Sequence, residues 1–140
     1  MDILNLKVVT PRKLILDEEV FSVTAPTPQG EVTILPHHAN FLCLLVEGII
    51  KIRKKSGEDY LAIGGGYLET DGKDLHILVS RAYGQDEINQ ELIEKGIEEA
   101  KKILAKSKDQ KERTEAARIL RRSIIDLKLL KKRKRPLSNM

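Results

Sequence analysis

The stretch Arg81-Ala82-Tyr83-Gly84-Gln85-Asp86 marks the point where the hydrophobic pattern of the chain changes. Before Gly84, apolar residues recur at every second position between turn residues, which is typical of β-strands. After Gly84, apolar residues recur at helical spacing in a segment rich in lysine and arginine. The pattern predicts two domains, residues 1–84 and residues 85–140.

The charges divide in the same way. Residues 1–85 contain nine Lys or Arg against eleven Asp or Glu, a net charge of −2, and residues 86–140 contain sixteen against ten, a net charge of +6. The net charge of the whole chain, +4, therefore understates how basic the second domain is. Such an excess attracts acidic partners by electrostatic steering.

The first domain reads as a series of short strands separated by Gly, Pro, Ser and Asp. The candidate strands are residues 4–8, 20–24, 32–35, 41–46, 49–54, 60–63, 67–70 and 75–79. Pro26 and Pro28 close the second of them. This spacing predicts an antiparallel β-sandwich or barrel.

The second domain reads as two amphipathic helices. Asp86 and Glu87 stand where the start of a helix favours acidic residues, and residues 107–113 read as a turn. The predicted apolar stripes are Ile88, Leu92, Ile97, Ala100 and Leu104 on the first helix, and Ala116, Leu120, Ile124, Leu127 and Lys131 on the second. The expected fold is α+β, with a β-sandwich followed by an antiparallel helical hairpin.

The sequence offers no catalytic, metal or phosphate site. Gly64-Gly65-Gly66 is not followed by the Gly-Lys-Ser/Thr of a phosphate-binding loop, and it reads as a tight turn. The neighbours His37 and His38 point apart on an extended chain, and His76 lies alone in a predicted strand. Nothing pairs a nucleophile with a base. We therefore expect no enzymatic activity, no metal and no cofactor.

The basic run Lys128–Arg135 could bind nucleic acid, anionic lipid or an acidic protein surface, or could simply be a solvated helix end. No Trp, Tyr or Phe follows Gly84 to stack on bases, and beyond its core stripe the tail lacks bulky apolar residues for membrane insertion. An acidic protein partner fits better than nucleic acid or membrane. A free-standing adaptor that binds an acidic protein or RNA through the hairpin remains an alternative.

Several segments in series resemble the epsilon subunit of the bacterial F-type ATP synthase. They are Val8-Val9-Thr10-Pro11, Gly30-Glu31-Val32-Thr33-Ile34-Leu35-Pro36-His37-His38-Ala39, Gly48-Ile49-Ile50 and Gly65-Gly66-Tyr67-Leu68-Glu69. Their order and spacing are similar to those of the family, and the junction at residues 81–86 is similar too. Each motif alone is weak, but together they cover nearly the whole chain.

The resemblance implies a non-catalytic rotor subunit in the central stalk. The sandwich would bind the gamma subunit and rest on the ring of c subunits, coupling proton flow to ATP synthesis. Glu31 and His38 match polar loop positions near those rotor contacts. The subunit would lie at the cytoplasmic face of the bacterial inner membrane as a peripheral part of the complex.

For the hairpin, the resemblance implies a mobile inhibitor of ATP hydrolysis. In the family, the hairpin can extend into the catalytic head, where it contacts alpha and beta subunits, including an acidic segment of beta. The residues expected to make these contacts are Arg118, Arg121, Arg122 and Lys128. The role of the basic tail, residues 131–135, is left open.

Some family members also bind ATP in the folded hairpin through an Ile/Leu-Asp-x-x-Arg-Ala pattern and two arginines of the second helix. Here Asn89 replaces the aspartate, Leu92 replaces the arginine, and Asp126 stands where one arginine is expected. A carboxylate beside a triphosphate, with fewer cations, opposes binding. We therefore expect no tight binding of ATP.

Overall fold

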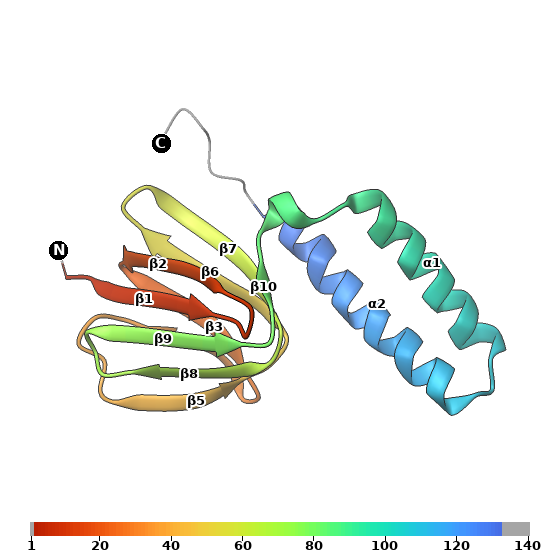
Figure 1. Cartoon of the computed structure of the whole chain (residues 1–140), viewed down its shortest axis with the longest axis horizontal. Coiled ribbons are helices and arrows are strands. Elements are labelled where there is room, and N and C mark those ends of the chain that lie inside the picture. Colours follow the sequence, from red (N-terminus) through yellow and green to blue (C-terminus); the bar gives the residue numbers. More distant parts are fainter. Residues whose placement is uncertain (1, 133–140) are drawn as a thin grey trace. The chain divides into compact units, whose positions relative to one another are not determined.

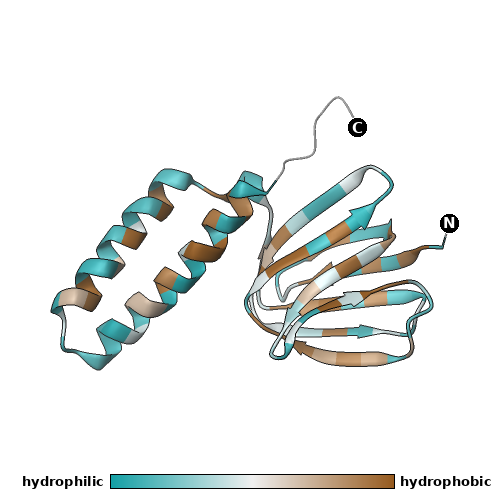
Figure 2. Cartoon of the chain, turned by 180° about the vertical axis from the view of Figure 1, so that it is seen from behind, coloured by the Kyte–Doolittle hydropathy of each residue, from teal (hydrophilic) through white to brown (hydrophobic). Residues whose placement is uncertain are grey.

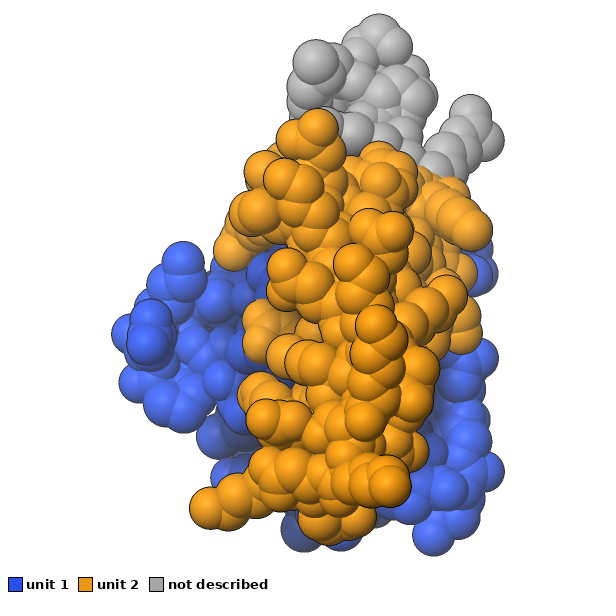
Figure 3. All heavy atoms as spheres, turned by 90° about the vertical axis from the view of Figure 1, so that its right-hand side faces the viewer, with its two compact units in different colours: residues 1–84, 133–140 blue, residues 85–132 orange. Residues whose placement is uncertain are grey.

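The computed structural model describes residues 2–132 in two units. The first unit extends to Gly84, and the second comprises Gln85–Lys132 (Figure 3). The first unit holds all the strands, and the second holds both long helices (Figure 1). Part of the basic tail, residues 133–135, lies outside the described residues.

Two five-stranded sheets build the first unit. The first sheet has the order β2-β1-β9-β8-β5 and the second the order β10-β7-β6-β3-β4. The strands are β1 (Leu4–Val9), β2 (Leu14–Val20), β3 (Ser22–Thr27), β4 (Gly30–Ile34), β5 (Phe41–Leu45), β6 (Gly48–Lys54), β7 (Gly57–Ile63), β8 (Gly66–Thr70), β9 (Asp74–Val79) and β10 (Ala82–Tyr83). The predicted β-sandwich is confirmed.

The core of the sandwich comes from the inward-facing residues of both sheets. Leu4, Leu6 and Val8 of β1 are completely buried, and their neighbours Asn5 and Lys7 are not. Because successive side chains of a strand point to opposite faces, this alternation fixes which face of β1 meets the core. The whole core cluster of the sandwich lies between Leu4 and Ala82. The first unit therefore has its own hydrophobic core.

One strand pair departs from the expected antiparallel arrangement. β1 runs parallel to β9, with Asn5 opposite Asp74 and Val9 opposite Leu78. Alternation of apolar and polar residues is the same in parallel and antiparallel strands, so the sequence pattern carries no information on direction. The first sheet is therefore mixed.

β2 was not predicted from the sequence, and β3 extends beyond its predicted end at Thr24. β2 has the sequence Leu14-Ile15-Leu16-Asp17-Glu18-Glu19-Val20, whose three successive acidic residues hide the alternation. β2 is an edge strand, and charged residues are common at sheet edges. Pro26 lies inside β3, which is possible because only Ser22, Val23 and Thr24 of that strand pair with β6.

Two helices, α1 (Gln90–Lys106) and α2 (Gln110–Lys131), form the second unit and run antiparallel to each other (Figures 1 and 2). Asp86 and Glu87 belong to a short 3₁₀ turn, η1 (Gln85–Glu87), and do not begin α1 as predicted. Asn89 is the N-cap of α1, because its side chain accepts a hydrogen bond from the Leu92 amide. The predicted hairpin is confirmed, with a later start.

The turn between the helices is shorter than the predicted residues 107–113. Asp109 caps α2 by accepting a hydrogen bond from the Lys111 amide, so the helix begins at Gln110. Ser107 Oγ donates a hydrogen bond of 2.6 Å to the Glu112 carboxylate. The Arg113 guanidinium donates to the carbonyls of Leu104 and Ser107 and thus satisfies the end of α1.

The predicted apolar stripe of α2 is only partly correct. The buried residues of α2 are Ala116, Ser123, Asp126 and Leu129, and two of these are polar. Ile124 and Lys131, which the prediction placed on the stripe, are exposed. The apolar pattern did not predict the buried side correctly, because α2 buries the polar residues Ser123 and Asp126 whereas Ile124 is exposed.

Candidate partner-binding surfaces

An apolar row crosses the outer face of the first sheet. Leu44 on β5 lies opposite Tyr67 on β8, and Tyr67 lies opposite Leu78 on β9. Leu78 lies opposite Val9 on β1, which in turn pairs with Leu14 on β2. The side of these strands that faces the core is formed by other residues, so the row faces outward.

The row is accessible to a partner. Leu44 is 67% exposed, Leu14 52% and Tyr67 41%, and Leu42 on β5 is as exposed as Leu44. Single exposed apolar residues are normal at a protein surface, but a row that is continuous over five strands is typical of an interaction surface. The outer face of this sheet is therefore a candidate docking surface.

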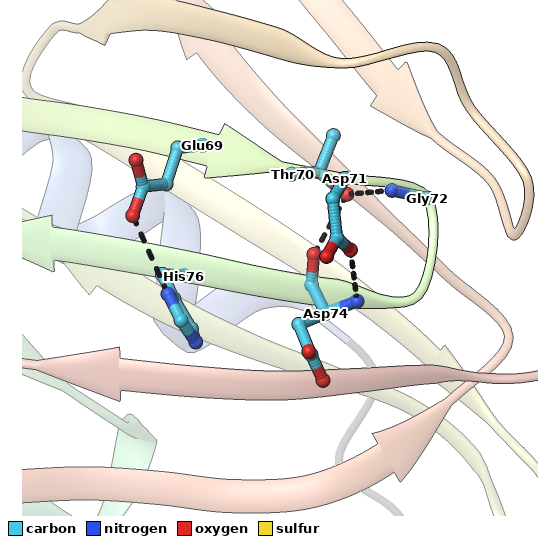
Figure 4. A network of polar contacts seen from close by, with 6 residues as sticks. All are labelled: Glu69, Thr70, Asp71, Gly72, Asp74 and His76. Carbon is cyan, nitrogen blue, oxygen red and sulfur yellow. Dashed lines mark hydrogen bonds and ion pairs between the residues drawn. The ribbon is translucent and has the colours of Figure 1, made fainter.

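A groove of about 490 Å³ lies beside this row. It is lined by Asn40, Phe41, Leu42, Glu69, Thr70, Asp71, Asp74 and His76. Several of its polar side chains bond to one another or to the β8–β9 turn (Figure 4). Among residues 2–132, no group of three or more His, Cys, Asp or Glu residues is placed to hold a metal ion.

Hydrogen bonds within the β8–β9 turn hold the Asp71 carboxylate and the Thr70 hydroxyl in place. Asp71 Oδ1 accepts hydrogen bonds from the amides of Asp74 and Lys73, at 2.8 and 2.9 Å, and these bonds hold the pKa of the Asp71 carboxyl below its usual range. Thr70 Oγ1 accepts from the Gly72 amide and donates to the Asp74 carbonyl. These groups give the turn a fixed shape (Figure 4).

The loop that contains His38 packs against this same turn. The His37 amide donates to the Gly72 carbonyl at 2.8 Å, and His37 itself has a positive φ of 67°. The His38 ring lies 5.3 Å from the ring of Phe41, which lines the groove. His38 is therefore positioned next to the groove.

Glu31 belongs to a different part of the sandwich. It is the second residue of β4, an exposed position on the edge strand of the second sheet, and it pairs with Pro26 of β3. His38 lies four residues beyond the end of that strand, at Ile34. Within the described sandwich, no hydrogen bond or ion pair joins Glu31 to His38, and the two residues belong to different elements, β4 and the loop after it.

The four cations predicted to contact the catalytic head are all exposed on α2. Arg118, Arg121, Arg122 and Lys128 lie within one half of the helix surface, given 3.6 residues per turn. Arg118 forms two hydrogen bonds with the Glu115 carboxylate, at 2.6 and 3.1 Å. These bonds lower the pKa of Glu115. The structure thus gathers the four residues on one face.

The three residues that depart from the ATP-binding pattern have other places in the hairpin. Asn89 caps α1, as described above. Leu92 is 65% exposed, and Asp126 is among the buried residues of α2.

The apolar row and the groove were not predicted from the sequence. They depend on the register of strands far apart in the chain, although the exposed alternation of Leu42 and Leu44 was a readable signal.

Comparisons with known proteins give the same family for the sandwich and for nearly the whole chain. Residues 3–85 match the family described as "ATP synthase, Delta/Epsilon chain, beta-sandwich domain". The chain is 33% identical to the chloroplastic ATP synthase epsilon chain of Anthoceros angustus over 97% of its own length and 99% of that protein. It is 36% identical to the ATP synthase epsilon chain of Syntrophobacter fumaroxidans, covering 92% of its own length and 96% of that protein.

Solved structures give the same result. A chain in the cryo-EM structure of Euglena gracilis mitochondrial ATP synthase, which contains OSCP/F1/c-ring, superposes with a TM-score of 0.79 at 26% identity. The match covers 90% of this chain and 79% of that chain. The sandwich, the helical hairpin and these similarities place this chain in the ATP synthase epsilon-chain family.

Proposed function

We propose that the protein is a non-catalytic central-stalk subunit that connects the gamma subunit to the c-ring, so that proton flow is coupled to ATP synthesis. The observation that carries the proposal is similarity to epsilon chains over nearly the full length of the chain. Within residues 2–132, no helix is long and apolar enough to cross a membrane. The subunit would reach the cytoplasmic face of the bacterial inner membrane through its partners.

The sandwich would supply the contacts within the rotor. The apolar row on the first sheet offers a surface of the kind that stable protein interfaces bury, and gamma is the partner proposed for it. Glu31 and His38 are proposed to contact gamma or the c-ring. Because Glu31 lies on edge strand β4 and His38 in the loop that packs against the β8–β9 turn, each is expected to serve a different contact.

The hairpin would act as an inhibitor of ATP hydrolysis. Arg118, Arg121, Arg122 and Lys128 form an exposed cationic face that complements an acidic segment of the beta subunit. Inserted between catalytic subunits, this face would form charge-assisted contacts that oppose rotation. The hairpin would therefore favour whichever state of the enzyme offers those contacts.

We further propose that ATP does not bind the hairpin tightly. Asn89, Leu92 and Asp126 replace the groups that would pair with a triphosphate, and Asp126 adds a carboxylate. Isothermal titration of the full chain with ATP tests this proposal. A dissociation constant in the micromolar range would overturn it.

The test of the main proposal is hydrolysis of ATP by a complex of alpha, beta and gamma subunits from the same source. The complex is titrated with the full chain or with a version that ends at Gly84, which retains the complete sandwich core. We expect the full chain to inhibit and the shortened chain to bind without inhibiting. If neither chain binds the complex, the proposed function is wrong.

A further inference from the structure

Ile124 is an apolar residue that the hairpin does not bury. The sequence pattern placed it on the apolar stripe of the second helix, but it is 45% exposed in the structure. Its neighbours three and four positions away on the surface of α2 are the exposed cations Arg121 and Lys128 on one side and the partly buried Leu120 and Leu127 on the other. Lys131 follows one turn further along the same side. Ile124 thus lies at the border between the cationic face and the partly buried side of α2.

The packing of α2 is achieved by other residues. Ala116, Ser123, Asp126 and Leu129 are its buried positions, and Leu120 and Leu127 are partly buried. An isolated exposed isoleucine would require no explanation. This one lies among residues proposed to contact an acidic partner, where a residue chosen only for charge or solubility would be polar.

A cationic face and an apolar anchor contribute to binding in different ways. Contacts between exposed charges weaken as salt screens them, over a Debye length of about 10 Å at 0.1 M ionic strength. Burial of an apolar side chain is not screened in this way, and interfaces commonly concentrate affinity in such an anchor, surrounded by polar contacts. Ile124 has the position of an anchor, because charges flank it along the helix on both sides.

We infer that Ile124 is the apolar anchor of the inhibitory face, and that its partner is an acidic surface with an apolar side chain or pocket at its centre. Arg121 and Lys128 would pair with carboxylates around that centre. The inference rests on the proposed function of the hairpin and names the chemistry of its partner. Charge complementarity selects the acidic surface, and the exposed isoleucine requires the apolar component.

The decisive variants are Ile124→Ala and Ile124→Lys, tested for inhibition of ATP hydrolysis by the alpha–beta–gamma complex at low and high salt. Both replacements suit a helix at least as well as isoleucine, so α2 is retained, which far-UV circular dichroism verifies. If Ile124 is an anchor, Ile124→Ala raises the concentration for half-inhibition about tenfold at both salt concentrations. Ile124→Lys then weakens inhibition too, despite its additional charge.

Two controls separate the possible results. Leu92→Ala removes an even more exposed apolar residue from α1 and should leave inhibition unchanged. Arg121→Ala should weaken inhibition at low salt more than at high salt.

If wild type inhibits but Ile124→Ala inhibits equally well and Ile124→Lys inhibits better, the inference that Ile124 is an anchor is wrong, while the proposed function stands. If wild type does not inhibit at all, both the inhibitory hairpin and the anchor are overturned.

Discussion

Lys54 on β6 joins the two sheets of the sandwich. Its ammonium group lies 2.8 Å from a Glu18 oxygen on β2 and 2.6 Å from an Asp59 oxygen on β7, and its side chain is only 13% exposed. Removing the cation would leave two partly buried carboxylates without their shared partner. We expect Lys54→Met to lower the free energy of unfolding by about 1–3 kcal/mol in urea denaturation.

Lys51→Met is the matched control, because Lys51 pairs with Glu58 on the same two strands of the second sheet but is well exposed. Exposed ion pairs contribute little to stability, so this variant should unfold almost as wild type does. Equal losses in the two variants would contradict the role given to Lys54.

The contribution of Lys54 also depends on pH. Burial lowers the pKa of the ammonium group, but hydrogen bonds to Asp59 and Glu18 outweigh burial, so its pKa is raised above the ordinary value of 10.5. A group whose pKa is higher in the folded state stabilises fully below its unfolded pKa and loses that effect as pH rises through the folded value. The stability difference between wild type and Lys54→Met should therefore be constant near neutral pH and shrink only in the alkaline range.

Gly72 allows the β8–β9 turn to meet the loop that carries His38. Its φ is +91°, and a Cβ atom placed there would lie 2.6 Å from the His38 carbonyl oxygen. Gly72→Ala should destabilise the sandwich by about 1–3 kcal/mol through strain and this clash, measured by thermal unfolding. Gly65→Ala is the control, since a Cβ there meets Leu45 at an ordinary 3.6 Å.

Among the elements, strands with clear alternation were predictable and those with masked alternation were not. β9 has the burial pattern expected from Leu75, Ile77 and Val79, so the alternation in its sequence was sufficient to predict the strand. β2 was not predicted because Asp17, Glu18 and Glu19 interrupt its alternation. The strand can hold these charged residues because it lies at the edge of the sheet. The helices were predictable from their period, but their ends depended on capping by Asn89 and Asp109.

The candidate sites also differ in how far they could be predicted from the sequence. Arg118, Arg121, Arg122 and Lys128 share a helix face because helical spacing is readable in one segment of sequence. The apolar row brings Leu14 and Leu44 onto one face of a sheet through a parallel pairing that no local pattern encodes. Sites within one element are thus accessible to sequence reasoning, and sites across several strands require the topology.

The hairpin has an internal clamp at its turn. Arg113 of α2 donates to the carbonyls of Leu104 and Ser107 at the end of α1. Arg113→Ala should remove these bonds and weaken the hairpin by about 1 kcal/mol. Hydrogen exchange should then accelerate at amides of α1 and α2 and stay unchanged in the strands. Acceleration throughout the sandwich would show that the hairpin does not open as a separate unit.

The chain is divided into two compact units, and the sandwich unit has its own hydrophobic core. Because the sandwich core lies entirely between Leu4 and Ala82, a chain ending at Gly84 should fold without the hairpin. We expect one cooperative thermal transition and a strand-rich circular dichroism spectrum for this shortened chain. A spectrum without strand signal would mean that the sandwich depends on the helices.

The parallel pairing of β1 with β9 constrains the order of events while the ribosome synthesises the chain. β1 emerges first, yet its neighbour on one side begins only at Asp74, so the first sheet stays divided until Val79 has left the ribosome. Such distant pairings form late and leave exposed strand edges in the meantime. The nascent subunit is thus most vulnerable to proteases and most attractive to chaperones in the interval before β9 has paired with β1.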